Sequence, residues 1–122
     1  MLVHNDYLKE LGVGKNTYPL GNSCTHETEL DKQAGVIPCQ TWNLNLTLAM
    51  ELYTYLRAFK DNTHGHPACL ESMEEWEKIL DEMIEGFADY IKRRDELDFN
   101  ADYPKLRHSL NLMKEWWDAL WW

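Results

Sequence analysis

The sequence predicts an all-α fold: a three-helix bundle with a mostly irregular N-terminal arm. Apolar residues recur at helical spacing in three separate segments after residue 40. Helix start signals precede the second and third of these segments, and glycine or proline interrupts the link before the second. With 122 residues, the chain is long enough for one domain with a hydrophobic core. We divide this single domain, residues 1–122, into an arm at residues 1–40 and a helical core at 41–122.

The N-terminal arm shows little periodicity. A short helix is expected from Asp6 to Leu11, because Gly12 and Gly14 follow it and favour termination. The stretches "NTYPLGNS" and "QAGVIPCQ" are rich in turn-forming residues and predict loops. The arm should therefore be mostly loop or short strand, packed over the bundle.

The first helix of the core is expected from about Trp42 or Asn43 to Lys60. Its opening, "TWNLNLTL", alternates like a strand, so the pattern leaves the start open. Gly65 and Pro67 then indicate a loop. The apolar stripe of this helix consists of Leu46, Ala49, Leu52, Tyr53, Leu56 and Phe59.

The second helix has the clearest signals. Ser72 and Glu75 have the spacing of a capping box, and the cationic run Lys92 to Arg94 suits a helix C-terminus. Between them lies a broad apolar face, formed by Met73, Trp76, Ile79, Leu80, Met83, Ile84, Phe87 and Ile91.

The third helix should begin near Pro104, with Asp102 or Tyr103 as its cap. At 100° per residue, one face contains Leu106, Leu110, Met113, Trp117, Leu120 and Trp121, so both of these tryptophans are expected in the core. Three further apolar residues lie off this face: Leu112, Trp116 and Trp122. Together with Trp121 they form the expected interface. A second copy of the chain, or alternatively the N-terminal arm, would cover it.

Composition limits the classes of function. The formal charge is −9, and residues 61–98 hold twelve acidic and four basic residues. This charge argues against nonspecific binding to duplex nucleic acid or anionic membranes. The acidic strip is either the solvated side of a helix or a surface that mimics nucleic acid. No apolar run approaches a membrane span, no signal-peptide block is visible, and three cysteines cannot all pair. We therefore expect a cytoplasmic protein with reduced thiols.

Catalytic motifs are missing from the sequence. It contains no phosphate-binding loop, dinucleotide fingerprint, H-E-x-x-H or G-x-S-x-G. Helical nucleotide pyrophosphatases use clustered acids on facing helices, and the second helix offers Asp81, Glu82, Glu85 and Asp89. The first helix supplies only Glu51, so a matching acid pair is missing. We predict a protein that is not an enzyme and carries no cofactor.

The best candidates for metal ligands lie in two loops. Cys24-x-His26 and His64-x-His66-x-x-Cys69 could together close a tetrahedral zinc site. Neither half has the spacing of a standard zinc finger, and a polar loop in which His66-Pro67 forms a turn is the preferred interpretation. We therefore assign no metal site.

A small-ligand pocket is a further hypothesis. Aromatic rings stack on nucleobases and amides read their edges, while cations contact phosphate. The candidate ligand-binding residues are Thr41, Trp42, Asn43, Asn45, Arg57 and Lys60. Lys105, Arg107 and Lys114 could contribute at a subunit boundary. Asn45 is expected on the apolar stripe of the first helix. Alternatively, it caps that helix, and the cations are solvated surface charges.

The segments "TWNLNLTLAMELYTYLRAF", "HGHP", "MEEWEKILDEMIEGF" and "NLMKEWWDALW" resemble a widespread group of small tailed-phage proteins, over roughly Cys39 to Trp122. Two positions depart from the group: Asn45 stands where an acid is common, and the end is Trp121-Trp122. Members mostly have no assigned activity. The resemblance implies an accessory role in the host bacterial cytoplasm, of the kind that counters bacterial defence.

Three functions are therefore weighed. The first is a homo-oligomeric protein that sequesters a small cyclic-nucleotide immune signal without catalysis. The alternative is an acidic inhibitor that covers a basic host protein, such as a defence or nucleic-acid-binding protein. A structural or virion-assembly role is the third. None of them requires duplex nucleic acid or a membrane as a partner.

Overall fold

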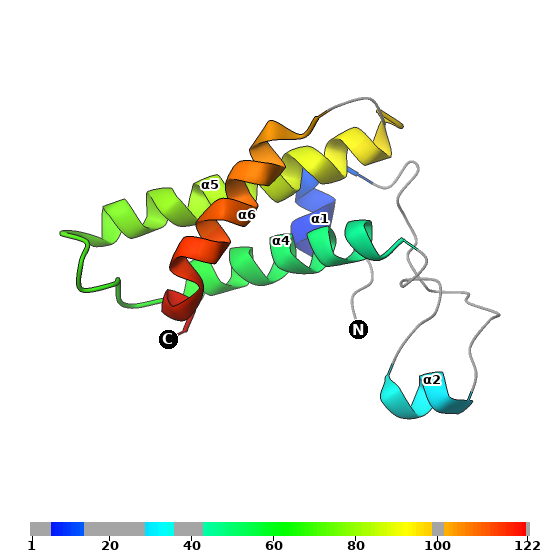
Figure 1. Cartoon of the computed structure of the whole chain (residues 1–122), viewed down its shortest axis with the longest axis horizontal. Coiled ribbons are helices and arrows are strands. Elements are labelled where there is room, and N and C mark those ends of the chain that lie inside the picture. The colour runs from blue at the N-terminus through cyan, green and yellow to red at the C-terminus, as the bar shows by residue number, and fades with distance from the viewer. Residues whose placement is uncertain (1–5, 14–28, 36–42, 99–101, 122) are drawn as a thin grey trace.

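The computed structural model of the chain describes residues 6–13, 29–35, 43–98 and 102–121 (Figure 1). The regular structure in these ranges is entirely helical, which confirms the predicted all-α bundle of three long helices. In order the elements are α1 (Asp6–Leu11), α2 (Glu29–Ala34), α4 (Leu44–Asn62), α5 (Met73–Asp95), α6 (Pro104–Trp116) and a 3₁₀ turn, η1 (Trp117–Ala119). Helix α5 is central: α4 and α6 each pack along it, and scarcely against each other.

The helix starts follow the local sequence signals. The Ser72 hydroxyl accepts the backbone N–H of Glu75 at 3.3 Å, a cap that stabilises a helix by about 1 kcal/mol. The Glu75 carboxylate accepts the backbone N–H of Glu71 at 3.0 Å, one residue before the position that a capping box uses. Pro104 occupies the first turn of α6, and Tyr103 is its cap residue, with φ at 51°. The predicted starts of these two helices are therefore confirmed.

The core lies between α4 and α5. The predicted apolar faces of both helices are confirmed as buried or half-buried against it. The largest of its fully buried side chains are Trp76 and Phe87, each 1% exposed. Met50 and Tyr90 belong to the core as well, although neither was expected there. The remaining buried hydrophobic residues are Leu8, Leu46, Ala49, Tyr53, Leu56, Leu80, Met83, Ile84, Ile91 and Met113.

Helix α6 crosses α5 in close contact at Gly86. A Cβ atom placed on Gly86 would collide with the Ser109 side chain and with the Lys105 carbonyl oxygen. Ser109 is fully buried, and its hydroxyl donates to the Glu82 carbonyl oxygen at 3.1 Å, which satisfies this polar group inside the contact. Two small residues therefore set where, and how closely, the two helices cross.

The predicted core face of α6 is confirmed for Leu106, Met113 and Leu120, which are buried or pack against the core, and is wrong for the other three residues. Trp117 is 63% exposed, Trp121 is 76% exposed and Leu110 is 49% exposed. The helix instead turns the line through Ser109, Met113 and Trp116 toward α5, because small Ser109 allows the close crossing. The α-helix also ends at Trp116, so Trp121 lies beyond the segment to which the 100° projection applies.

Helix α1 confirms the short helix expected in the arm, and it is docked on α4. Leu8 is 1% exposed, and Tyr7 donates to Asp61 at 3.0 Å. Arg57 donates to Glu10 at 2.7 Å and lies 4.9 Å from the centre of the Tyr7 ring. Helix α2 was not predicted within the arm, and it lies apart from the long helices (Figure 1).

Candidate functional site

Those residues assigned to a nucleotide pocket that the structure describes do not come together. Thr41 and Trp42 fall outside the described residues. Asn43 is half-buried at the start of α4, and Asn45 is exposed, with its side-chain oxygen accepting the backbone N–H of Leu46 at 2.9 Å. The expected place of Asn45 on the buried stripe is wrong. Its exposed side chain instead accepts a hydrogen bond from one of the free N–H groups of the first helical turn.

Both cations assigned to that pocket are engaged within the chain. Arg57 bonds Glu10, and it also donates to the Tyr53 hydroxyl at 2.7 Å. The hydrogen bond to Glu10 is the main reason that the pKa of Arg57 is raised. Lys60 forms an ion pair with Asp81 at 2.6 Å. Arg57 also lies twelve residues beyond Asn45, which is about 18 Å along a helix at 1.5 Å per residue.

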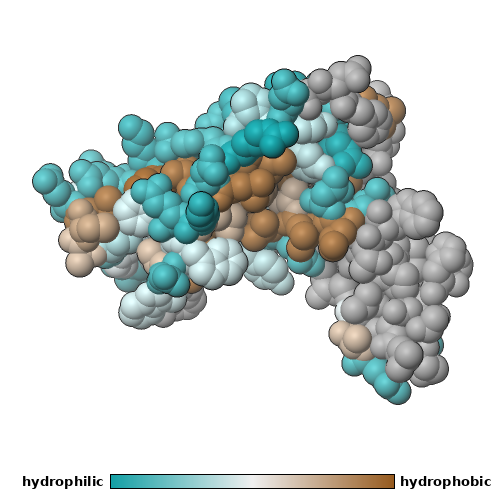
Figure 2. Space-filling view, in the orientation of Figure 1, coloured by the Kyte–Doolittle hydropathy of each residue, from teal (hydrophilic) through white to brown (hydrophobic). Residues whose placement is uncertain are grey.

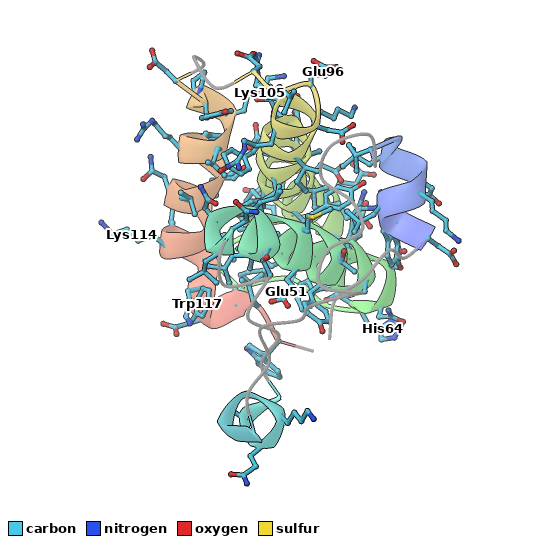
Figure 3. All side chains as sticks on the ribbon, turned by 90° about the vertical axis from the view of Figure 1, so that its right-hand side faces the viewer. Glu51, His64, Glu96, Lys105, Lys114 and Trp117 are labelled. Atoms are coloured by element: carbon cyan, nitrogen blue, oxygen red, sulfur yellow. The ribbon has the colours of Figure 1, made fainter. Side chains whose placement is uncertain are left out.

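The three cations proposed for a subunit boundary differ in their surroundings. Lys105 pairs with Glu85 at 2.8 Å, and the Arg107 side chain donates to the Asp102 carbonyl oxygen at 3.0 Å. Lys114 is exposed and projects outward from α6 (Figure 3). These residues therefore do not form one cationic patch.

The acids in the middle of α5 are largely neutralised by nearby bases. Asp81 pairs with Lys60, Glu85 pairs with Lys105, and Asp89 pairs with Arg93 at 3.0 Å. Glu82 lies 3.7 Å from His108. The hydrogen bond from Lys105 lowers the pKa of Glu85. An open acid cluster of the kind a divalent cation needs is therefore not assembled at these positions.

The proposed zinc ligands are not brought together by the described part of the chain. Cys24 and His26 lie outside it, whereas His64, His66 and Cys69 are exposed in the loop between α4 and α5. The described residues contain no group of three or more side chains that could hold a metal ion.

Unpaired acids gather at one end of the bundle, which we call the acidic end. It is the end at which α5 begins and α6 finishes, because the Trp76 and Trp116 rings meet there with centroids 5.7 Å apart. Its carboxylates are exposed or half-buried, and none forms an ion pair with a described residue. They belong to Glu71, Glu74, Glu77, Glu115 and Asp118.

A groove of about 650 Å³ opens at the acidic end, and we call it the loop groove. Tryptophans from α5, α6 and the C-terminal segment line it together with the loop after α4. Its lining residues are Thr63, His64, Gly65, His66, Pro67, Ala68, Trp76, Glu115, Trp116, Asp118, Ala119 and Trp121. Lysine and arginine are absent from this described lining, whereas two carboxylates are present.

The sequence did not predict this groove. Its two most visible signals in the sequence are the "HGHP" loop and the C-terminal tryptophans. Nothing in the spacing indicated that they meet.

A second groove, of about 380 Å³, lies between α4 and α6. It is lined by Leu52, Tyr55, Leu56, Ala58, Phe59, Asn62, Met113, Trp117 and Leu120. The exposed large apolar side chains of α4, α6 and η1 include Leu44, Leu48, Tyr55, Leu110 and Trp117. Figure 2 shows this apolar surface extending from α6 over the N-terminal half of α4.

The structure separates the expected interface residues that it describes. Leu112 and Trp116 are half-buried and pack against the core, Trp121 is exposed in the loop groove, and Trp122 lies outside the described residues. The exposed apolar surface therefore includes Trp117, which was expected to be buried.

Comparison with known proteins yields no relative: the chain matches no family model, no curated protein and no solved structure. None of the described helices combines the length and apolar character that crossing a membrane requires.

Proposed function

We propose that this chain is a non-catalytic binding protein whose acidic end captures a basic surface of a protein partner. One observation carries the proposal: two carboxylates without an ion-pair partner among the described residues, Glu115 and Asp118, line an aromatic groove whose described lining contains no basic side chain except histidine. Proteins that bind nucleic acid carry concentrated basic grooves, and an acidic surface competes for them. Such a partner also suits the accessory, counter-defence role implied by the phage resemblance.

The distribution of charge supports an electrostatic mode of capture. The chain has a net charge of −9, and three acids in the middle of α5 are paired internally, whereas those of the acidic end have no ion-pair partner among the described residues. Complementary charge accelerates encounter and discriminates between partners, and salt screens both effects. The tryptophans of the loop groove would add contact area that salt screens less.

The test is competitive elution of bacterial DNA-binding proteins from DNA-cellulose at low salt. The chain should release a small set of them, and Glu74→Lys with Glu77→Lys should abolish release. Glu96→Lys with Asp102→Lys changes the net charge equally at exposed positions, and Glu96 is at the far end of α5. This control should release the same proteins. Equal release by both double variants, or no release by the unmodified chain, would reject the proposal.

Sequestration of a cyclic nucleotide stays a prediction with less structural support. Arg57 and Lys60 are occupied by Glu10 and Asp81, so phosphate would have to displace those carboxylates. A ligand that binds only the native state raises the melting temperature. A cyclic dinucleotide that produces such a shift at micromolar concentration would restore this hypothesis.

Self-association also stays a prediction, but the structure favours a different contact surface for it. The apolar surface around Tyr55 and Trp117 replaces the one expected at Leu112 and Trp116. Light scattering coupled to size exclusion measures the assembly state directly. If a dimer forms through this surface, Trp117→Glu should convert it to a monomer.

A further inference from the structure

We infer that the loop groove is a binding site for arginine, and that it receives a guanidinium group from the basic partner. This inference rests on the proposed function and names the chemical group that the acidic end recognises. A guanidinium is planar and always charged, stacks on aromatic faces, and pairs with carboxylates through parallel hydrogen bonds. The groove offers both kinds of contact.

Three tryptophans supply the aromatic contacts. Trp76 lines the groove although only 1% of it is exposed, and its ring meets that of half-buried Trp116 at an interplanar angle of 59°. Trp121 is 76% exposed and lines the same groove. An exposed tryptophan face attracts a cation through its ring quadrupole, and tryptophan is the strongest of the aromatic side chains in this respect.

The charges in the groove select the sign of the ligand. Glu115 and Asp118 are both exposed and line it, and no described lysine or arginine lies on its surface to repel a cation. The same two carboxylates would repel the phosphates of a nucleotide. A lysine ammonium would also be attracted, but it is more strongly hydrated and cannot stack as a plane.

The wall of the groove is formed by an ordered loop. The backbone N–H of Thr63 donates to the Phe59 carbonyl oxygen at 2.8 Å, which continues the hydrogen bonding of α4 into the loop. The Thr63 hydroxyl donates to the Gly65 carbonyl oxygen at 3.4 Å, and the Leu70 N–H donates to the Pro67 carbonyl oxygen at 3.0 Å. These bonds hold the wall in place before a ligand arrives, which reduces the entropy lost on binding.

The test measures fluorescence anisotropy of a labelled peptide, acetyl-Gly-Arg-Gly-Arg-Gly-amide, titrated with the full chain. Trp121→Ala should weaken binding at least about fivefold, as expected for removal of a cation–π contact. Glu115→Gln with Asp118→Asn should weaken it at least as much. Trp117→Ala is the matched control, because Trp117 is similarly exposed but lines the other groove; it should change the Kd less than twofold.

Two further peptides test the chemistry of the ligand. Citrulline has nearly the shape of arginine without its charge, so the citrulline peptide should not bind. The lysine peptide should bind at least about threefold more weakly than the arginine peptide. Equal binding of the lysine and arginine peptides would overturn recognition of a guanidinium.

The groove assignment and the proposed function can fail separately. If Trp121→Ala binds the arginine peptide like Trp117→Ala, while elution from DNA-cellulose still depends on Glu74 and Glu77, the assignment to the loop groove is wrong and the proposed function stands. If neither the peptide nor DNA-cellulose elution shows any dependence on the acidic end, both are wrong. Circular dichroism of each variant checks that the helices are intact.

Discussion

Replacing Gly86 with alanine should destabilise the bundle, although alanine is the better helix former. Gly86 lies in the middle of α5, where α6 crosses. The added Cβ would collide with the Ser109 hydroxyl and with the Lys105 carbonyl oxygen, and it would lie 2.6 Å from the Ser109 Cβ. One of these atoms belongs to the backbone, so a rotamer change cannot remove the conflict and α6 must move away.

The magnitude follows from two opposing contributions. The higher helix propensity of alanine stabilises the folded state by about 0.8–1.0 kcal/mol relative to glycine. Overpacking of a tight contact costs about 1–3 kcal/mol, and more when the backbone must shift. Three conflicting atoms place Gly86→Ala at the upper end of that range, so we expect a net loss of about 2 kcal/mol. For a domain of this size, that corresponds to a fall of roughly 6–10 °C in melting temperature.

Urea unfolding followed by circular dichroism measures the loss. Gly65→Ala is the matched control, because a Cβ there meets nothing within 4 Å and its φ is not positive, so its stability should be unchanged or slightly higher. Ser109→Gly combined with Gly86→Ala removes the side-chain conflicts and should recover part of the loss. A Gly86→Ala protein as stable as the unmodified chain would refute the close crossing of α5 and α6.

Three further predictions concern stability. Trp76→Ala should cost about 3–5 kcal/mol in urea unfolding, because it empties the most deeply buried aromatic site, and a loss below about 1 kcal/mol would contradict that placement. Arg57→Leu removes the bond to Glu10, so amide hydrogen exchange in α1 should accelerate severalfold while α5 is unaffected; unchanged α1 exchange would count against docking through Arg57. Lys105 lowers the pKa of Glu85 in the folded state, so their ion pair stabilises the fold. This stabilisation is fully present above the ordinary pKa of 4.5 and is lost as pH falls through the lower pKa of the folded state. Glu85→Gln should therefore be less stable than the unmodified chain at about pH 7 and equally stable near pH 2; an equal deficit at both pH values would contradict this pairing.

The first two helices of the core could be predicted because burial there follows the repeat of large apolar residues. Leu46, Tyr53 and Leu56 on α4 are buried where the stripe places them, and so are Leu80 and Phe87 on α5. The start of α5 could also be predicted, since its cap depends only on residues a few positions apart in the sequence.

The orientation of α6 could not be predicted, because it depends on a contact between residues 23 positions apart in the chain. Gly86 and Ser109 are small, and neither registers in a search for apolar periodicity. Their close approach rotates the helix, so that Trp116 packs on Trp76 and Trp117 faces out.

The candidate site could not be predicted from the sequence for a related reason. Whether a cation is free depends on distant carboxylates: Arg57 pairs with Glu10, 47 positions away, and Lys60 pairs with Asp81, 21 positions away. The loop groove likewise requires the segment after α4 to meet the C-terminal end of α6. Figure 3 shows His64 and Trp117 on the side of the bundle opposite Glu96 and Lys105, an arrangement that sequence spacing does not reveal.

The central claim is that the acidic end binds an arginine-bearing partner through the loop groove. The most direct measurement is an NMR titration of the indole N–H signals with the arginine peptide, because each tryptophan contributes one such signal. The account predicts shifts for Trp121 and Trp116, which line the groove, with no shift for Trp117. Shifts confined to Trp117, or an unchanged spectrum at millimolar peptide, would contradict it.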